Sequence, residues 1–457
     1  MTAPRSNSAD PSSAALPRST RAVFAAILLL YLALASAQSF ATRLQWGPDE
    51  PAHIIYVQSL ALDGRLPALA HSVDDNAYLP GASSTHQAQH PPLYYTAAAL
   101  LWRAFGSRSD EAVRYTTDRT TGEILTFTVP GPVRPVRFLS VLLGALTLAF
   151  VWATGRTVFP QAPAVCLAGV AFAAFTPMFT YVNSVINNDA LLGVLFAATA
   201  WQWARIVRFG AAPRDIVFLG LLLGLAINVK ETALSLVLLS AVVLAVEPAG
   251  GPWRRRLARI GVVLAFAAVI GGWWFVRKSL LYGSPFVHPF HAPLLELPHE
   301  QQVLLLKVLP ARIFLFAFIP IDAIASHARV DLLFCFFGAL SVLSLVGLVV
   351  LHLRRKQLQP PRHEVVSFLL WLAAAALVLT GLWWNLLTVD WRMGTSGGRL
   401  LLCTLPLLSL AAARGLSALF GDGKAAKLGL AAAVLSLLAA NFYALWATAA
   451  EYGTLGL

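Results

Sequence analysis

Two adjacent carboxylates, Asp49 and Glu50, stand between prolines just after the first long apolar segment of the chain. Acidic side chains at the mouth of a membrane segment are costly unless they are used, and acid–base chemistry is what such a carboxylate can do. The same residues also suit a helix start, because Pro51 fits a first helical turn and a preceding acid can cap it. Both interpretations can hold together, since a capped helix gives a carboxylate a fixed direction.

Cations stand next to other apolar segments. Lys230 precedes Glu231 between two apolar stretches, where the pair is either a structural ion pair or part of a phosphate site. Arg399 follows two glycines, which permit close backbone approach to a ligand, and a guanidinium can bind phosphate through two hydrogen bonds. Arg277 follows two tryptophans that are typical of a membrane interface, which does not by itself explain the charge.

Polar side chains of the remaining connectors complete the set of candidates. His90 precedes two prolines in the same connector as Asp49, and Asp189 directly opens an apolar helix after two asparagines. His90, His288 and His291 are candidate ligands for a divalent metal beside a carboxylate. The alternative is that they are ordinary polar side chains of loops, so the sequence does not require a metal or any other cofactor.

The composition shows what positions these residues. Of 457 residues, 58% are hydrophobic and 12% are charged, whereas a soluble domain usually has about a quarter of its residues charged. The charges collect between apolar segments, many of them long enough to cross a bilayer core of about 30 Å as a helix. We therefore predict an all-α, polytopic membrane protein of about eleven transmembrane helices. The predicted spans include one over 162–183, and a further apolar stretch over 303–321 is predicted to be an interfacial helix.

The net charge of +12 is concentrated in short connectors, as the positive-inside bias expects for cytoplasmic loops, and this distribution argues against a nucleic-acid partner. Residues 1–21 are then a disordered cytoplasmic N-terminus, 22–450 form the membrane domain and 451–457 form a short tail. Within the membrane domain, 43–134 form a large first extracytoplasmic loop with juxtamembrane helices, and 278–330 form a second outer segment. All the candidate residues fall on the outer side.

In combination, these residues resemble the GT-C superfamily of membrane glycosyltransferases, and most closely the branch of protein O-mannosyltransferases, aminoarabinose transferases and their uncharacterised bacterial relatives. The matching motifs occur in the same order along most of the chain: Asp49-Glu50, His90-Pro91-Pro92-Leu93, Arg134 or Arg137, Asp189, Gly224-Leu225-Ala226 with Lys230, and Arg399-Leu400-Leu401.

The resemblance implies an inverting transfer of a sugar from a polyprenyl phosphate to an extracytoplasmic glycan, lipid or protein, in a bacterial inner membrane. Asp49 is then the candidate base, with Glu50 orienting or replacing it. Lys230, Arg137 and Arg399 would stabilise the departing phosphate. His90, Asp189 and Arg277 are further substrate-binding candidates.

Two other functions fit such a chain. A transporter or flippase of lipid-linked glycans would need ionisable residues at mid-membrane in a path that reaches both faces. A non-catalytic scaffold for envelope assembly would need none of the chemistry. A pocket that encloses Asp49, Lys230 and Arg399 would favour the enzyme.

Overall fold

The computed structural model describes residues 17–44, 46–69, 84–106, 115–117, 124–127, 132–247, 251–289, 291–320, 329–354, 360–391, 397–421 and 423–452. The disorder expected for the N-terminus lies outside the described residues up to residue 16, and residues 18–21 instead form the first turn of a helix. The expected tail also lies outside them from residue 453 onward.

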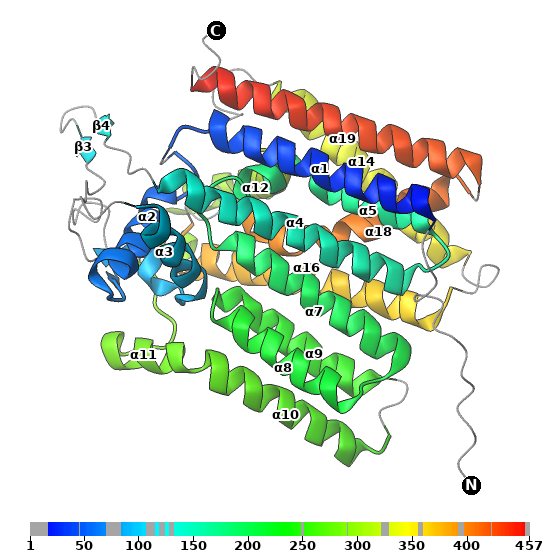
Figure 1. The fold of residues 1–457 in the computed structure, drawn as a ribbon, viewed down its shortest axis with the longest axis horizontal. Helices are drawn as coiled ribbons and strands as arrows, with labels where there is room; N and C mark the ends of the chain where they lie inside the picture. Colours follow the sequence, from blue (N-terminus) through cyan, green and yellow to red (C-terminus); the bar gives the residue numbers. More distant parts are fainter. Residues whose placement is uncertain are drawn as a thin grey trace.

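The chain is a multi-pass helical membrane protein whose long helices run side by side in one bundle (Figure 1). The helices of this bundle are α1 Arg18–Ala41, α4 Val133–Val158, α5 Pro163–Ala174, α6 Pro177–Val182, α7 Asp189–Phe209, α8 Pro213–Ile227, α9 Leu234–Val246, α10 Trp253–Gly271, α12 His299–Phe318, α14 Val330–Leu353, α16 Arg362–Thr388, α18 Leu405–Leu419 and α19 Lys424–Glu451. Among the described residues, seven helices are long and apolar enough to cross a membrane. The number rises to nine if two bent pairs each form one span: α10 with Trp273–Tyr282, and Gly397–Cys403 with α18. The predicted count of eleven is not confirmed.

Two segments differ from their predictions. The single span expected over 162–183 is broken into α5 and α6, because Pro177 begins a new helix directly after Thr176. The segment expected to be interfacial over 303–321 is part of α12, which is one of the seven candidate spans. The helix is long and apolar enough to qualify as a span although it contains Lys307 and Arg312.

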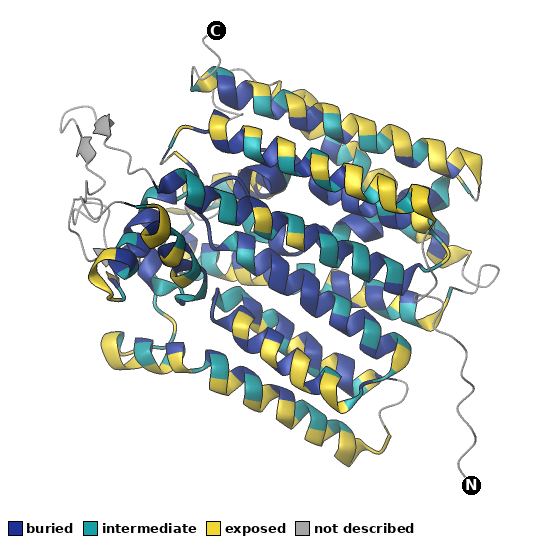
Figure 2. Ribbon diagram, viewed as in Figure 1, coloured by how far each residue is buried: buried dark blue, intermediate teal, exposed yellow. Residues whose placement is uncertain are grey.

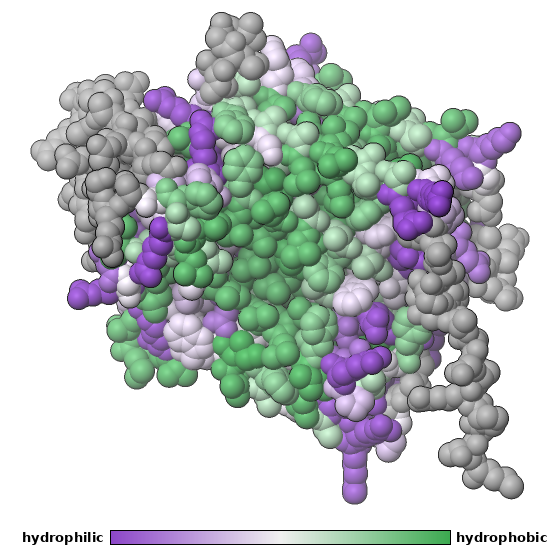
Figure 3. Space-filling view, in the orientation of Figure 1, coloured by the Kyte–Doolittle hydropathy of each residue, from purple (hydrophilic) through white to green (hydrophobic). Residues whose placement is uncertain are grey.

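Burial separates a central helix from a lipid-facing shell. α7 is buried along nearly its whole length, whereas α10, α14 and α19 keep large apolar side chains exposed (Figure 2). The face seen in Figure 3 carries a broad apolar band between two hydrophilic ends. Such a band is expected where hydrocarbon replaces water as the solvent.

Shorter elements gather at one end of the bundle (Figure 1). They include α2 Glu50–Gln58, the π-helical turn Ser59–Asp63, α3 Leu93–Phe105 and α11 Trp273–Tyr282, together with the 3₁₀ turns His86–Gln89, Glu231–Ala233, Leu294–Glu296 and Gly397–Cys403. Two small strand pairs accompany them: β1 Ala68–Leu69 is parallel to β2 Ser84–Thr85, and β3 Tyr115–Thr117 is antiparallel to β4 Ile124–Phe127. The juxtamembrane helices expected in the first loop are therefore present as α2 and α3.

The turn 397–403 is held by a backbone contact. A Cβ atom on Gly398 would lie 2.0 Å from the carbonyl oxygen of Ile313 and 2.6 Å from the amide nitrogen of Ala317. Gly398 thus permits close approach to α12, rather than to a ligand as its sequence context suggests. This contact sets the position from which Arg399 projects.

Candidate active site

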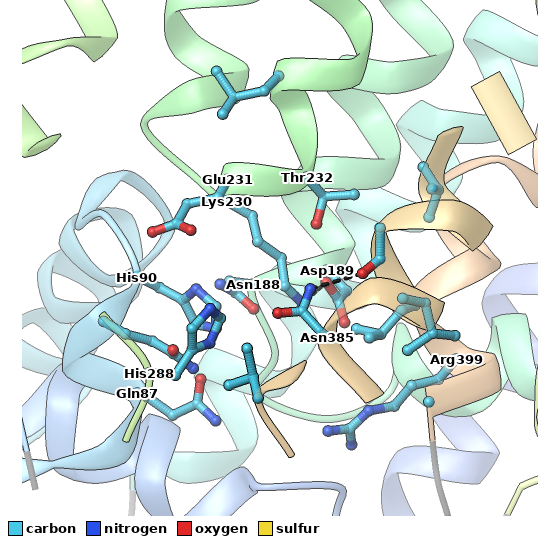
Figure 4. Close-up of a pocket in the computed structure, with 18 of the residues that line it drawn as sticks. Gln87, His90, Asn188, Asp189, Lys230, Glu231, Thr232, His288, Asn385 and Arg399 are labelled. Carbon is cyan, nitrogen blue, oxygen red and sulfur yellow. Dashed lines mark hydrogen bonds and ion pairs between the residues drawn. The ribbon is translucent and has the colours of Figure 1, made fainter. Parts of the chain in front are cut away.

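One cavity of about 730 Å³ lies where the short elements meet the bundle. Its polar side is formed by the loop before α2, the turn before α3, the N-terminal end of α7 and the connection between α8 and α9. Its other side is formed by α9 and by the C-terminal part of α16 (Figure 4). The cavity encloses Asp49, Lys230 and Arg399 together, although these residues are far apart in the sequence.

Asp49 stands at the N-cap of α2 with φ of +56°, the only positive φ of a residue other than glycine in the described parts of the chain. Aspartate tolerates this region better than most residues, but it is sparsely populated and such strain gathers at functional sites. The side chain is 37% exposed and forms an ion pair with Arg399. His86 Nε2 lies 3.9 Å from its other oxygen.

The electrostatic surroundings keep Asp49 ionised. Burial acts to raise the pKa of its carboxyl, but the Arg399 guanidinium, with smaller contributions from His86 and His53, holds that pKa well below its usual range. A carboxylate in this state is a weak base while Arg399 remains its partner.

Glu50 and Arg137 form a second pair behind the cavity wall. The Arg137 Nε and Nη2 atoms donate to the two Glu50 carboxylate oxygens at 2.7 and 2.6 Å, and both side chains are fully buried. Arg137 also donates to the carbonyl oxygens of Ser39, Thr42 and Arg43, so it ties the end of α1 to α2. Neither Glu50 nor Arg137 lines the cavity, so neither lies where the catalytic role predicted for Glu50 or the phosphate-binding role predicted for Arg137 would place it.

Lys230 Nζ donates to Asp189 Oδ1 at 2.6 Å, and both side chains line the cavity while being largely buried. Asn188 supports this arrangement by donating to the carbonyl oxygen of Val229 at 3.3 Å. Lys230 does not form the ion pair with Glu231 that the sequence left open as an alternative. Asp189 therefore fixes the ammonium of Lys230 at the cavity wall.

Glu231 pairs instead with Lys278 of α11, whose side chain is 0% exposed. Lys278 was not among the predicted site residues, although it stands directly after Arg277 and the same tryptophan pair. The neighbouring Arg277 lies over the Trp274 ring, 4.8 Å from its centroid, and does not line the cavity. The substrate-binding role predicted for Arg277 therefore has no geometric support in this structure.

Histidines cover much of the polar wall: His53, His86, His90 and His288 all line the cavity. Burial lowers the pKa of each, with that of His53 falling to about 3 and that of His90 well below its usual value, so these imidazoles are neutral near pH 7. His53 Nδ1 is 2.9 Å from the hydroxyl of Tyr95. Neutral imidazoles can both donate and accept hydrogen bonds.

The predicted metal-binding set is not assembled. His90 and His288 line the cavity, but His291 is exposed, does not line it, and lies 3.5 Å from Glu296. Over the ranges given above, no group of three or more His, Cys, Asp or Glu side chains is arranged to hold a metal ion.

The remaining wall is apolar. It is formed by Leu234 and Leu238 of α9 and by Leu377, Val378 and Leu382 of α16. Leu238 is 56% exposed, so the lining of the cavity continues into the outer surface of a membrane helix. The cavity can thus hold a molecule with a charged head and an apolar tail.

The chain has the fold of the GT-C membrane glycosyltransferases, as its motifs predict. It resembles the crystal structure of ArnT from Cupriavidus metallidurans bound to undecaprenyl phosphate, with a TM-score of 0.51 and 14% identity, over 88% of this chain and 60% of that one. This chain therefore spans about 60% of the length of that relative. At this identity the likeness defines the fold.

Residues 129–275 match the family model of dolichyl-phosphate-mannose-protein mannosyltransferases. Two more distant structures are the apo oligosaccharyltransferase of Archaeoglobus fulgidus (TM-score 0.48, 13% identity, 94% of this chain and 56% of that one) and the Pmt1–Pmt2 complex of S. cerevisiae bound to the sugar donor (0.41, 18%, 62% and 36%). No curated protein sequence matches the chain.

Proposed function

We propose that this protein is an inverting glycosyltransferase that moves a sugar from a polyprenyl-phosphate carrier to an acceptor on the extracytoplasmic side of a bacterial inner membrane. One observation carries the proposal: a single cavity joins the Asp49–Arg399 and Asp189–Lys230 pairs to an apolar wall on two membrane helices. A lipid-linked sugar needs both surfaces, because its phosphate is anionic and its carrier is hydrocarbon.

The transfer step divides between these groups. An acceptor hydroxyl attacks the anomeric carbon, the bond from that carbon to the phosphate oxygen breaks, and the hydroxyl proton passes to Asp49. Arg399 and Lys230 stabilise the negative charge on the departing phosphate. Direct displacement by one nucleophile inverts the configuration at the anomeric carbon.

Donor binding also activates the base. The cations that face the phosphate are already paired with carboxylates, so the phosphate must compete for Arg399 with Asp49, the more exposed of the two acids. When the guanidinium turns to the phosphate, the pKa of Asp49 rises toward its usual range and the carboxylate becomes a better proton acceptor. Asp49 is therefore held inactive until a donor is present.

The position of the cavity supports an enzyme over a transporter. The polar elements that line it all lie at the end of the bundle where α2, α3 and α11 gather (Figure 1). The basic clusters at the start of α10 and at the start of α19 lie at the opposite end, which is cytoplasmic under the charge bias. A flippase would need a polar path between the two ends.

The test is a deletion strain whose envelope glycans, lipids and proteins are compared with those of the parent by mass spectrometry. We expect one glycosylated product to disappear and its polyprenyl-phosphate sugar to accumulate. Wild-type protein should restore the product, and Asp49→Asn should not, at equal membrane levels. An unchanged envelope and an unchanged pool of lipid-linked sugars would refute the proposed activity.

A further inference from the structure

One ion pair that reaches the cavity, Lys278 with Glu231, has no part in the transfer step. Lys278 is fully buried on the inner face of α11, while Leu280 on the outer face of the same helix is 81% exposed. Its partner Glu231 keeps 23% of its side chain exposed and lines the cavity. A buried cation is strongly destabilising without a partner, so the ion pair with Lys278 fixes the position of the Glu231 carboxylate.

The backbone directs two consecutive side chains into neighbouring parts of the cavity. Lys230 has extended backbone angles, with φ of −162° and ψ of 145°, so its side chain and that of Glu231 diverge. Figure 4 shows Lys230 turned toward Asp189 and Glu231 turned toward His90. A donor whose phosphate lies between Lys230 and Arg399 would carry its sugar, joined through one phosphate oxygen, in the same cavity that Glu231 lines.

Neutral polar groups surround Glu231. His90 and His288 both lie close enough to Lys278 for its charge to lower the pKa of their imidazoles, which places them around the same ion pair. Figure 4 shows both rings on the Glu231 side of Lys230, away from Arg399. Lys278 balances the charge of Glu231, so this ion pair adds no net charge to the compartment.

A fourth group indicates a ligand directly. Gln87 lines the cavity, is only 5% exposed, and its Oε1 atom accepts no hydrogen bond from any described residue. A buried acceptor without a donor costs about 1–3 kcal/mol. A hydroxyl group of a bound molecule would satisfy it.

We propose that Glu231, His90, His288 and Gln87 form the subsite that binds the ring hydroxyls of the donor sugar, and that this sugar is an uncharged hexose. A carboxylate and an amide oxygen accept hydrogen bonds from hydroxyls, while neutral imidazoles can do either. An acidic sugar would place a second carboxylate beside Glu231 and is disfavoured. This subsite rests on the proposed function, since the phosphate site sets where the sugar lies.

The test measures binding to the full chain in lipid nanodiscs, and compares bare undecaprenyl phosphate with undecaprenyl phosphate that carries glucose, mannose, galactose or glucuronic acid. We expect at least one neutral hexose to tighten binding by about 10- to 100-fold over the bare lipid, as hydrogen bonds to a charged group would. Glucuronic acid should give no gain. Glu231→Gln combined with Lys278→Met should abolish most of the hexose gain and change bare-lipid affinity by less than about 2-fold.

The double substitution removes both charges together, so no buried cation is left alone. Gln87→Leu provides a second variant. It should raise thermal stability or leave it unchanged, because it removes an unsatisfied acceptor, and yet reduce the hexose gain. A merely structural role for these residues predicts an unchanged hexose gain in every variant that folds.

The outcomes separate the two proposals. If bare undecaprenyl phosphate binds but no neutral hexose adds affinity, or the double variant keeps the gain, the sugar subsite is refuted and the donor class stands. If bare undecaprenyl phosphate does not bind, and Arg399→Met does not change the binding of any of the glycolipids, both the proposed function and the sugar subsite are refuted.

Discussion

The guanidinium of Arg399 pairs with the carboxylate of Asp49, 350 residues earlier in the chain, across the cavity floor. Two backbone features position the pair: Gly398 packs against the backbone of α12, and Asp49 adopts an αL conformation at the start of α2. The cation expected to bind the donor phosphate is thus also the partner of the expected base. This relationship makes substrate binding and base activation one event.

Asp49→Asn separates these two roles. Asparagine tolerates the αL conformation and keeps the size of the side chain, so the protein should fold. Transfer should fall by about 10²–10⁴-fold, because the proton acceptor is lost. Undecaprenyl phosphate should bind more tightly, because Arg399 no longer has a competing carboxylate. Titration in nanodiscs measures the affinity, and normal turnover by this variant would remove Asp49 from the mechanism.

The same pair predicts a pH dependence of stability. Since the pKa of Asp49 is held below its usual value of about 3.9, the pair stabilises the fold above that value and loses its contribution as the pH falls through the lower folded-state pKa. Thermal unfolding of wild type and Asp49→Asn should therefore converge as the pH is lowered below about 4. A gap that widens on acidification would contradict the assigned partner.

Arg137 should act through the fold. Arg137→Met leaves Glu50 buried without a counter-ion and should reduce stability by about 3–5 kcal/mol. Arg137→Met with Glu50→Leu should recover most of the folded protein. Arg134→Met is the matched control and should cost little, because Arg134 lies over the Phe40 ring and forms no ion pair with a described residue. The measurements are the yield of detergent-solubilised protein and its melting temperature. An Arg137→Met variant that is stable but does not bind the donor would support the phosphate-binding role predicted for Arg137.

Lys230 distinguishes an ion pair from a phosphate ligand. Lys230→Met should lower folded levels, because Asp189 loses its partner, and adding Asp189→Asn should restore them. Activity should stay lost in the double variant if the donor phosphate needs the ammonium. Lys230→Arg should keep part of the activity with altered geometry. Adding Glu231→Leu in place of Asp189→Asn should rescue nothing, and activity regained in the Asp189 double variant would show that Lys230 is structural.

Orientation can be tested by labelling. In a background without Cys166, Cys335 and Cys403, Asp63→Cys after α2 should react with an impermeant maleimide added from outside. Arg255→Cys at the start of α10 should react only after the membrane is opened. Both side chains are exposed, so access depends on the side of the membrane alone. The reverse pattern would place the cavity in the cytoplasm.

Much of the architecture follows from local patterns in the sequence. Apolar segments of sufficient length predict membrane helices, because every backbone polar group must be bonded within the segment. The short helices before and after residue 230 and the helix 93–105 follow from where such runs are interrupted. The resemblance, through the order of the motifs and their common side of the membrane, also implies that Asp49, Lys230 and Arg399 belong to one site, and they line one cavity.

The partner of each charge was decided only by the tertiary structure. Lys230 and Glu231 are neighbours in the chain, but an extended backbone points their side chains apart, to Asp189 and Lys278. The resemblance implies a phosphate-binding role for Arg137, whereas its burial against Glu50 depends on how the start of α2 packs against α4. An ion pair inside a protein is set by distance and desolvation, which a sequence contains only through its fold.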